Sequence, residues 1–131
     1  MRGIANYRRT DVESAPREEL VVLLFAAAVR REETADAAMA RGDRSAWNAE
    51  LHVARAIFLE LLQALDPATP SAVADPLRTT YRWLVHHLTV AGRDGDRARL
   101  AEVRRVTAGL HDTWARALAI HRGEAPAEEG A

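Results

Sequence analysis

The feature that most constrains the fold is a stripe of apolar residues that repeats at helical spacing. Within residues 45–65, the apolar positions recur at alternating steps of four and three residues. Such steps put about one apolar side chain per turn on a single face of an α-helix, as in helices that pack lengthwise against one another. The stretch therefore predicts a long amphipathic helix with the seam Trp47, Leu51, Ala54, Phe58, Leu61 and Leu65.

Three more stretches carry comparable stripes, and they predict helices at about 16–40, 71–91 and 96–121. The first stripe consists of Leu20, Leu24, Ala27 or Ala28, Ala35 and Met39. The second consists of Val73, Leu77, Tyr81, Leu84 and Leu88. The third consists of Leu100, Val103, Val106 or Thr107, Leu110, Trp114 and Leu118.

Short connectors separate these four stretches. Gly42 is a natural end for the first helix, Pro67 and Pro70 break the chain after the second, and Gly92 and Gly95 follow the third. Because short connectors place consecutive helices side by side and antiparallel, the fold is expected to be all-α. The prediction is an antiparallel up-down-up-down four-helix bundle over residues 14–121.

Both ends of the chain are expected to lie outside the bundle. Ser14 and Pro16 are typical of a helix start, so residues 1–13 form a mobile arm, with or without a short extra helix. Ile4 and Tyr7 in this arm cannot bury each other and must dock on another apolar surface. Residues 122–131 have no apolar anchor and are expected to be a disordered tail.

Composition excludes several classes of function. Eighteen basic and nineteen acidic side chains leave a net charge of −1, which gives no electrostatic reason to bind nucleic acid or an anionic membrane. The absence of cysteine excludes disulfides, thiolate catalysis and thiolate-bound zinc. No stretch is long and apolar enough for a membrane span, and no secretory signal is evident. A cytoplasmic protein is expected.

Catalytic and metal-binding patterns are also missing. A di-iron bundle needs Glu-x-x-His motifs, which this chain lacks, and none of its five histidines has the spacing of a metal ligand. The Asp94-Gly95-Asp96 segment has too few acidic residues for a calcium loop and is typical of a turn with a helix cap. We therefore expect no metal, no cofactor and no enzymatic activity.

Several apolar residues lie beside the stripes. Taken singly, each is compatible with a wide core face. Taken together, they indicate surface grooves that accept an amphipathic helix of a partner, and Ile4 and Tyr7 could cover part of such a groove while the partner is absent. The off-stripe residues are Phe25, Val29, Ile57, Leu62 and Trp83.

The order and spacing of these motifs resemble the FliS family of flagellin-specific export chaperones, from Gly3 to about Leu118. The matching elements are Ile4-x-x-Tyr7, the segment from Val12 to Pro16 followed by Leu20 and Leu24-Phe25, Gly42-Asp43, the run from Ala54 to Asp66, and Ala74-x-x-Leu77-x-x-x-Tyr81-x-x-Leu84-x-x-x-Leu88. Asp96, Leu100, Glu102-Val103, Leu110 and Trp114 complete the pattern.

The resemblance implies a cytoplasmic chaperone that binds the disordered C-terminal segment of flagellin in apolar grooves. It would prevent premature polymerisation and assist delivery to the flagellar type III export gate, a component of which would be a second partner. Ile4 and Tyr7 are assigned to partner binding from the motif match. Without a client, the same apolar surface favours self-association. A general adaptor or dimerisation bundle with another helical partner is the alternative.

Overall fold

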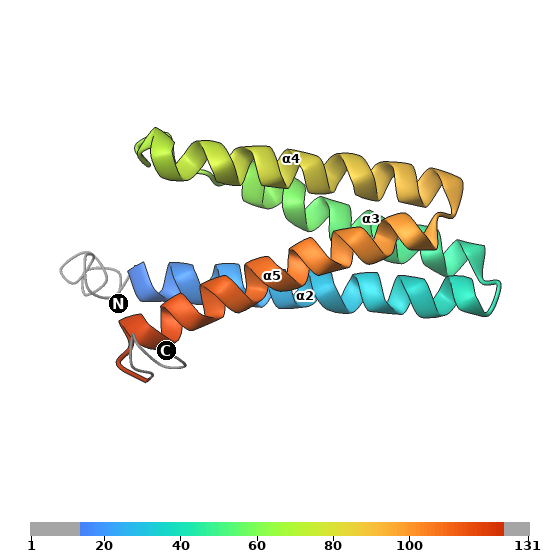
Figure 1. The fold of residues 1–131 in the computed structure, drawn as a ribbon, viewed down its shortest axis with the longest axis horizontal. Coiled ribbons are helices and arrows are strands. Elements are labelled where there is room, and N and C mark those ends of the chain that lie inside the picture. The colour runs from blue at the N-terminus through green and yellow to red at the C-terminus, as the bar shows by residue number, and fades with distance from the viewer. Residues whose placement is uncertain (1–13, 125–131) are drawn as a thin grey trace, which may run out of the picture.

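The computed structural model describes residues 14–124, so Ile4, Tyr7 and residues 125–131 of the expected tail at 122–131 lie outside the described residues. Four long helices run alternately up and down, which confirms the all-α antiparallel bundle (Figure 1). They are α2 (Ser14–Ala40), α3 (Arg44–Gln63), α4 (Ser71–Asp94) and α5 (Arg97–His121).

Two of the three connections are tight turns that end one helix and start the next. Gly42 has a φ of 81°, and the Asp43 N–H donates to the carbonyl oxygen of Ala38 at 2.8 Å, which ends α2 in a left-handed turn. The Asp43 side chain then accepts the N–H of Ala46 at 3.0 Å and caps α3. Gly95, with a φ of 62°, and Asp96 repeat this arrangement between α4 and α5.

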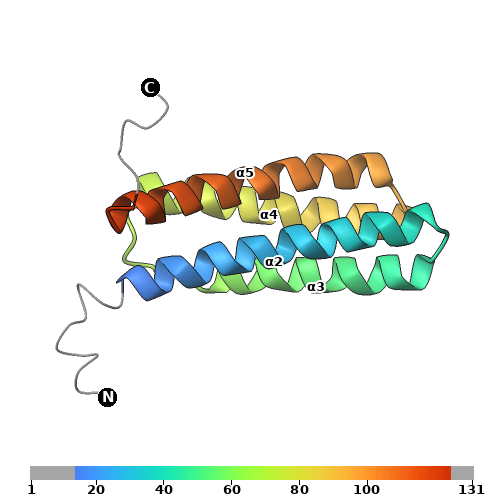
Figure 2. The ribbon, with the colours of Figure 1, turned by 90° about the horizontal axis from the view of Figure 1, so that it is seen from below.

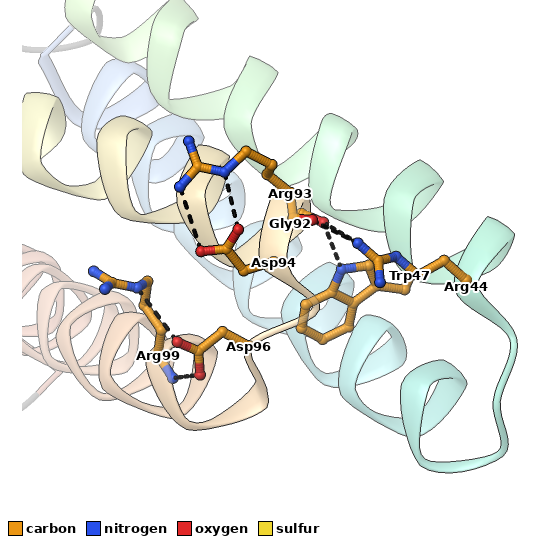
Figure 3. A network of polar contacts seen from close by, with 7 residues as sticks. All are labelled: Arg44, Trp47, Gly92, Arg93, Asp94, Asp96 and Arg99. Atoms are coloured by element: carbon orange, nitrogen blue, oxygen red, sulfur yellow. Dashed lines mark hydrogen bonds and ion pairs between the residues drawn. The ribbon is translucent and has the colours of Figure 1, made fainter.

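These two turns lie at the same end of the bundle, where polar contacts close it. The side chain of Arg44 donates to the carbonyl oxygens of Gly92 and Arg93 at 3.2 and 2.7 Å. The indole N–H of Trp47 also donates to Gly92, at 3.2 Å (Figure 3). Because the last carbonyls of a helix have no partner within it, these bonds satisfy the end of α4 and fix it against α3.

The third connection, between α3 and α4, lies at the opposite end. It spans residues 64–70 and includes Pro67 and Pro70, and Asp66 organises it by accepting the N–H of Ala68 at 2.9 Å. The start of α2 and the end of α5 lie at this same end (Figures 1 and 2). Around the bundle, α2 packs against α3 and α5, α4 packs against α3, and the α4–α5 pair packs least.

The core corrects part of the expected pattern. Phe25 is fully buried, and its ring centroid lies 6.5 Å from that of Phe58 and 6.3 Å from that of Tyr81. The expectation that Phe25 lies in an exposed groove is therefore wrong. Conversely, Leu20 and Val73, which were expected in the core, are 55% and 52% exposed. The core face of α2 is turned toward Phe25 because this helix is otherwise rich in alanine, and the aromatic ring is its largest apolar side chain.

An acidic residue is buried in this core, which the apolar pattern did not indicate. Glu32 of α2 is fully buried, and its Oε2 lies 3.0 Å from the hydroxyl of Thr107 in α5. Its Oε1 is buried without a hydrogen-bond partner among the described residues. Burial raises the pKa of Glu32 from 4.5 to about 8, so the group is mostly neutral at pH 7. A protonated Glu32 can donate to Thr107 while Thr107 donates to the carbonyl of Val103.

The raised pKa of Glu32 predicts that stability falls as the pH rises. Between its unfolded pKa of 4.5 and its folded pKa of about 8, the unfolded chain releases a proton that the folded chain keeps. Each pH unit in this window therefore costs about 1.4 kcal/mol of unfolding free energy. Glu32→Gln should flatten this dependence in urea unfolding at pH 5 to 8, whereas the exposed control Glu33→Gln should keep it. Equal slopes for the Glu32→Gln variant and the parent protein would contradict the assignment.

Candidate partner-binding site

A cavity of about 670 Å³ lies at the end of the bundle where α2 begins and α5 ends. All four helices and the 64–70 connection contribute to its wall. The apolar residues of the wall are Leu20, Val21 and Leu24 of α2, Leu61, Ala64 and Leu65 of α3 and its end, Val73, Leu77 and Tyr81 of α4, and Trp114 of α5.

An aromatic cluster of Phe25, Phe58, Tyr81 and Trp114 lies at and beneath this cavity. The ring centroids of Phe25 and Trp114 are 6.0 Å apart in an edge-to-face arrangement, and those of Phe58 and Tyr81 are 6.1 Å apart. Burial raises the pKa of Tyr81 to about 12, so its hydroxyl stays neutral. The inner wall of the cavity is thus apolar, aromatic and uncharged.

The mouth of the cavity combines charged residues with exposed apolar ones. Arg17, Glu18 and Asp66 are the charged residues that line it. Leu20 and Val73 also line it, although more than half of each side chain is exposed. Exposed leucine and valine at the edge of an apolar cavity gain free energy when a partner covers them, at about 25 cal/mol per Å² of apolar area. This end of the bundle is therefore suited to binding an apolar segment.

Two of the predicted partner-binding residues lie at the flanks of α2. Val29 is seven residues before Asp36, and Asp36 pairs with Arg97 of α5 at 2.8 Å. Residues seven apart share a helical face, so half-buried Val29 faces the α2–α5 seam. By the same spacing, half-buried Ile57 lies on the face of α3 that carries Glu50, which pairs with an arginine of α2 at 3.0 Å.

The other two, Leu62 of α3 and Trp83 of α4, lie on the two seams that α4 forms with its neighbours. Leu62 is seven residues after Arg55, whose Nη1 donates to the hydroxyl of Thr89 at 3.3 Å, so Leu62 belongs to the α3–α4 seam. Trp83 and Arg99 of α5 line a hollow of about 320 Å³ on the α4–α5 seam. Val29, Ile57, Leu62 and Trp83 therefore lie on four different seams, and none of them lines the large cavity.

Ile4 and Tyr7 belong to the thirteen residues that lie outside the described structure, immediately before α2. Because α2 begins at the cavity, these residues are connected to the chain at its mouth. The cavity wall itself was assigned to the core stripes by sequence reasoning. The length of the connection at 64–70 could have distinguished the cavity wall from the core. This connection is longer than the two tight turns and lets the helix ends diverge.

Neither a metal cluster nor a membrane-spanning helix is found in the described part of the chain. Within residues 14–124, no three His, Asp or Glu side chains gather where they could hold a metal ion. None of the helices α2 to α5 combines the length and the apolar character needed to cross a membrane.

Comparison with known proteins supports a flagellar role. A model of the family described as flagellar protein FliS matches residues 1–121. The chain belongs to the FliS family. This confirms the resemblance seen in the sequence, and the match covers the helices, the cavity wall and the residues that precede α2. FliS proteins are flagellar export chaperones for flagellin and are not known as enzymes. No protein of curated function matches the chain.

The distinction between aromatic core and cavity wall can be tested by paired substitutions in this FliS protein. Phe58 is fully buried, so Phe58→Ala should lower the unfolding free energy by about 3 to 5 kcal/mol. Leu65 is half-buried at the wall, so Leu65→Ala should cost clearly less. Urea denaturation at constant pH measures both. A larger loss of unfolding free energy for Leu65→Ala than for Phe58→Ala would show that the cavity wall stabilises the bundle more than the aromatic core does.

Proposed function

We propose that this FliS protein is a cytosolic export chaperone and that it binds the C-terminal segment of flagellin at the cavity between the helix ends. The observation that carries the proposal is the apolar cavity of about 670 Å³ with Leu20 and Val73 exposed at its edge, in a chain that belongs to this family. Arg44 and Trp47 close the bundle at its other end, which supports a cavity that exists before a client binds.

Binding at this cavity would prevent polymerisation by occupying the client's own apolar surface. A disordered segment that becomes helical on a preformed surface gains free energy from burial and loses part of it to ordering. The aromatic wall suits this task because half-buried Trp114 offers apolar area to a client and is already held in place by Phe25. A client covered in this way cannot use the same segment to associate with another flagellin.

The residues before α2 are proposed to cover the cavity when no client is bound. Ile4 and Tyr7 are apolar, and at most ten residues separate them from the start of α2 at the cavity mouth. A short tether keeps their local concentration high, so they would compete with the client and limit self-association. We further propose that the same arm takes part in delivery to the export gate, which would couple client release to export.

The location of the client site is tested by a matched pair of substitutions on α2. Leu20 and Leu23 are 55% and 59% exposed, so neither exchange to aspartate should unfold the bundle. Of these two leucines, Leu20 lines the cavity and Leu23 does not. In calorimetric titrations with the C-terminal segment of flagellin from the same genome, Leu20→Asp should weaken binding by about tenfold or more, which is about 1.4 kcal/mol. Leu23→Asp should bind like the parent protein.

The parent titration should also show a negative heat-capacity change, because apolar area leaves water. The absence of binding by any flagellin of the source genome would contradict the proposed function. Equal losses for Leu20→Asp and Leu23→Asp would contradict the cavity as the site.

The role of the arm is tested by deleting residues 2–10. Because this removes a competitor for the cavity, client affinity should stay the same or rise. The free protein should associate more strongly, as measured by sedimentation, because apolar area is uncovered. Motility of cells that carry the deletion should fall if the arm also serves delivery. A loss of client affinity beyond about tenfold would show that the arm is part of the binding site itself.

A further inference from the structure

The seam between α3 and α4 presents a second surface, separate from the cavity. The contact between Arg55 Nη1 and the Thr89 hydroxyl, at 3.3 Å, marks its centre. Residues four and seven positions away along each helix share this face. The α3–α4 face is defined here as Arg55, Leu59 and Leu62 of α3 together with Arg82, Val85 and Thr89 of α4.

This face has an apolar strip that neither helix covers. Leu59 is 40% exposed, although it lies in the middle of a bundle helix. Leu62 and Val85 are half-buried and pack against the core from the seam. Three apolar side chains over about two helical turns are enough to contact one face of a partner helix.

The charges of the α3–α4 face differ from those of the α2–α3 and α2–α5 seams, which have ion pairs between their two helices. The α2–α5 seam pairs its opposite charges across the two helices, for example Arg97 with Asp36 at 2.8 Å and Arg122 with Glu19 at 3.1 Å. By contrast, no Asp or Glu in residues 14–124 forms an ion pair with Arg55 or Arg82. The α3–α4 face therefore carries positive charge that the described part of the bundle leaves unneutralised.

A hollow beside Arg55 adds further hydrogen-bonding groups. It has a volume of about 140 Å³ and lies between the middle of α3 and the end of α4. Asn48, His52, Arg55 and Thr89 contribute polar side chains to its wall. A carboxylate readily accepts hydrogen bonds from guanidinium, amide and hydroxyl groups. The hydrogen bond to Thr89 partly holds Arg55 in place.

From the apolar strip and the unpaired arginines together, we propose that the α3–α4 face docks an amphipathic helix of a second protein that carries Asp or Glu beside its apolar side. The apolar contacts supply most of the affinity, and the carboxylates select the partner and its orientation. The face shares no residue with the wall of the cavity, so the acidic partner and the flagellin segment can be bound at the same time.

Two synthetic amphipathic peptides about five turns long test this proposal. Both carry the same leucines, and the flanking positions are Glu in one and Lys in the other. Fluorescence anisotropy with the full chain should show that the Glu peptide binds at least about tenfold more tightly than the Lys peptide. Its affinity should fall as salt is added, because exposed charges are screened.

Charge-removing variants locate the binding. The double variant Arg55→Gln, Arg82→Gln should lose most of the preference for the Glu peptide. The matched control Arg30→Gln, Arg116→Gln removes two exposed arginines from α2 and α5 and should keep it. Circular dichroism melts confirm that both double variants fold.

Three results would overturn the proposal. They are equal binding of the two peptides, no binding of the Glu peptide at its solubility limit, and an unchanged preference in the Arg55→Gln, Arg82→Gln variant. Loss of Glu-peptide binding in the cavity variant Leu20→Asp would also overturn it, because the peptide would then occupy the cavity. Since flagellin binding depends on Leu20 and peptide binding on Arg55 and Arg82, the two proposals fail separately.

Discussion

The structure depends on the burial of three aromatic rings where α2, α3 and α4 meet. Phe25 and Phe58 are completely buried, and Tyr81 is 2% exposed. Their centroids lie 6.1 to 6.5 Å apart, a separation at which aromatic rings attract each other beyond simple area burial. These rings fix three helices relative to one another, and Trp114 of α5 packs against Phe25 from the fourth. Tyr81 and Trp114 line the cavity, and this cluster holds both of them in place.

The two ends of the bundle have different connections, and the position of the cavity follows from that difference. At one end, Gly42 and Gly95 allow tight turns, and Arg44 and Trp47 bind the last carbonyls of α4. At the other end, the 64–70 connection spans a wider gap and leaves the apolar stripes partly uncovered. Side chains that would fill the core of a uniform bundle, such as Leu77, instead line a cavity. The bundle is thus closed by polar contacts at one end and hollowed by an apolar cavity at the other.

Sequence reasoning predicted the bundle because its signals are local. Helical spacing, the glycine turns and the Asp43 and Asp96 caps each act within a few residues. The site was harder to predict, since it depends on how the helices are rotated and how far their ends diverge. Phe25 appeared to lie off the stripe because the stripe was drawn through Leu20 and Leu24. Glu32 was missed because it occupies the seven-residue gap between Ala28 and Ala35 in the stripe, and an acidic side chain at such a gap is usually exposed.

The arrangement of the helices also explains why the predicted groove residues do not lie together in one site. A residue beside an apolar stripe lies at one of two flanks, and the sequence does not say which helix faces that flank. Val29, Ile57, Leu62 and Trp83 therefore ended on different seams. Of these, Leu62 belongs to the α3–α4 face, where its neighbours are unpaired arginines rather than the apolar wall of the cavity.

The most direct test of the central claim is to follow the methyl signals of the protein by NMR during titration with the C-terminal segment of flagellin. If the cavity is the client site, the largest shifts should occur at Leu20, Val21 and Leu77. The signal of Leu23, which is on α2 but outside the cavity wall, should change little. Shifts confined to Leu59 and Val85, with the cavity methyl groups unchanged, would contradict the account.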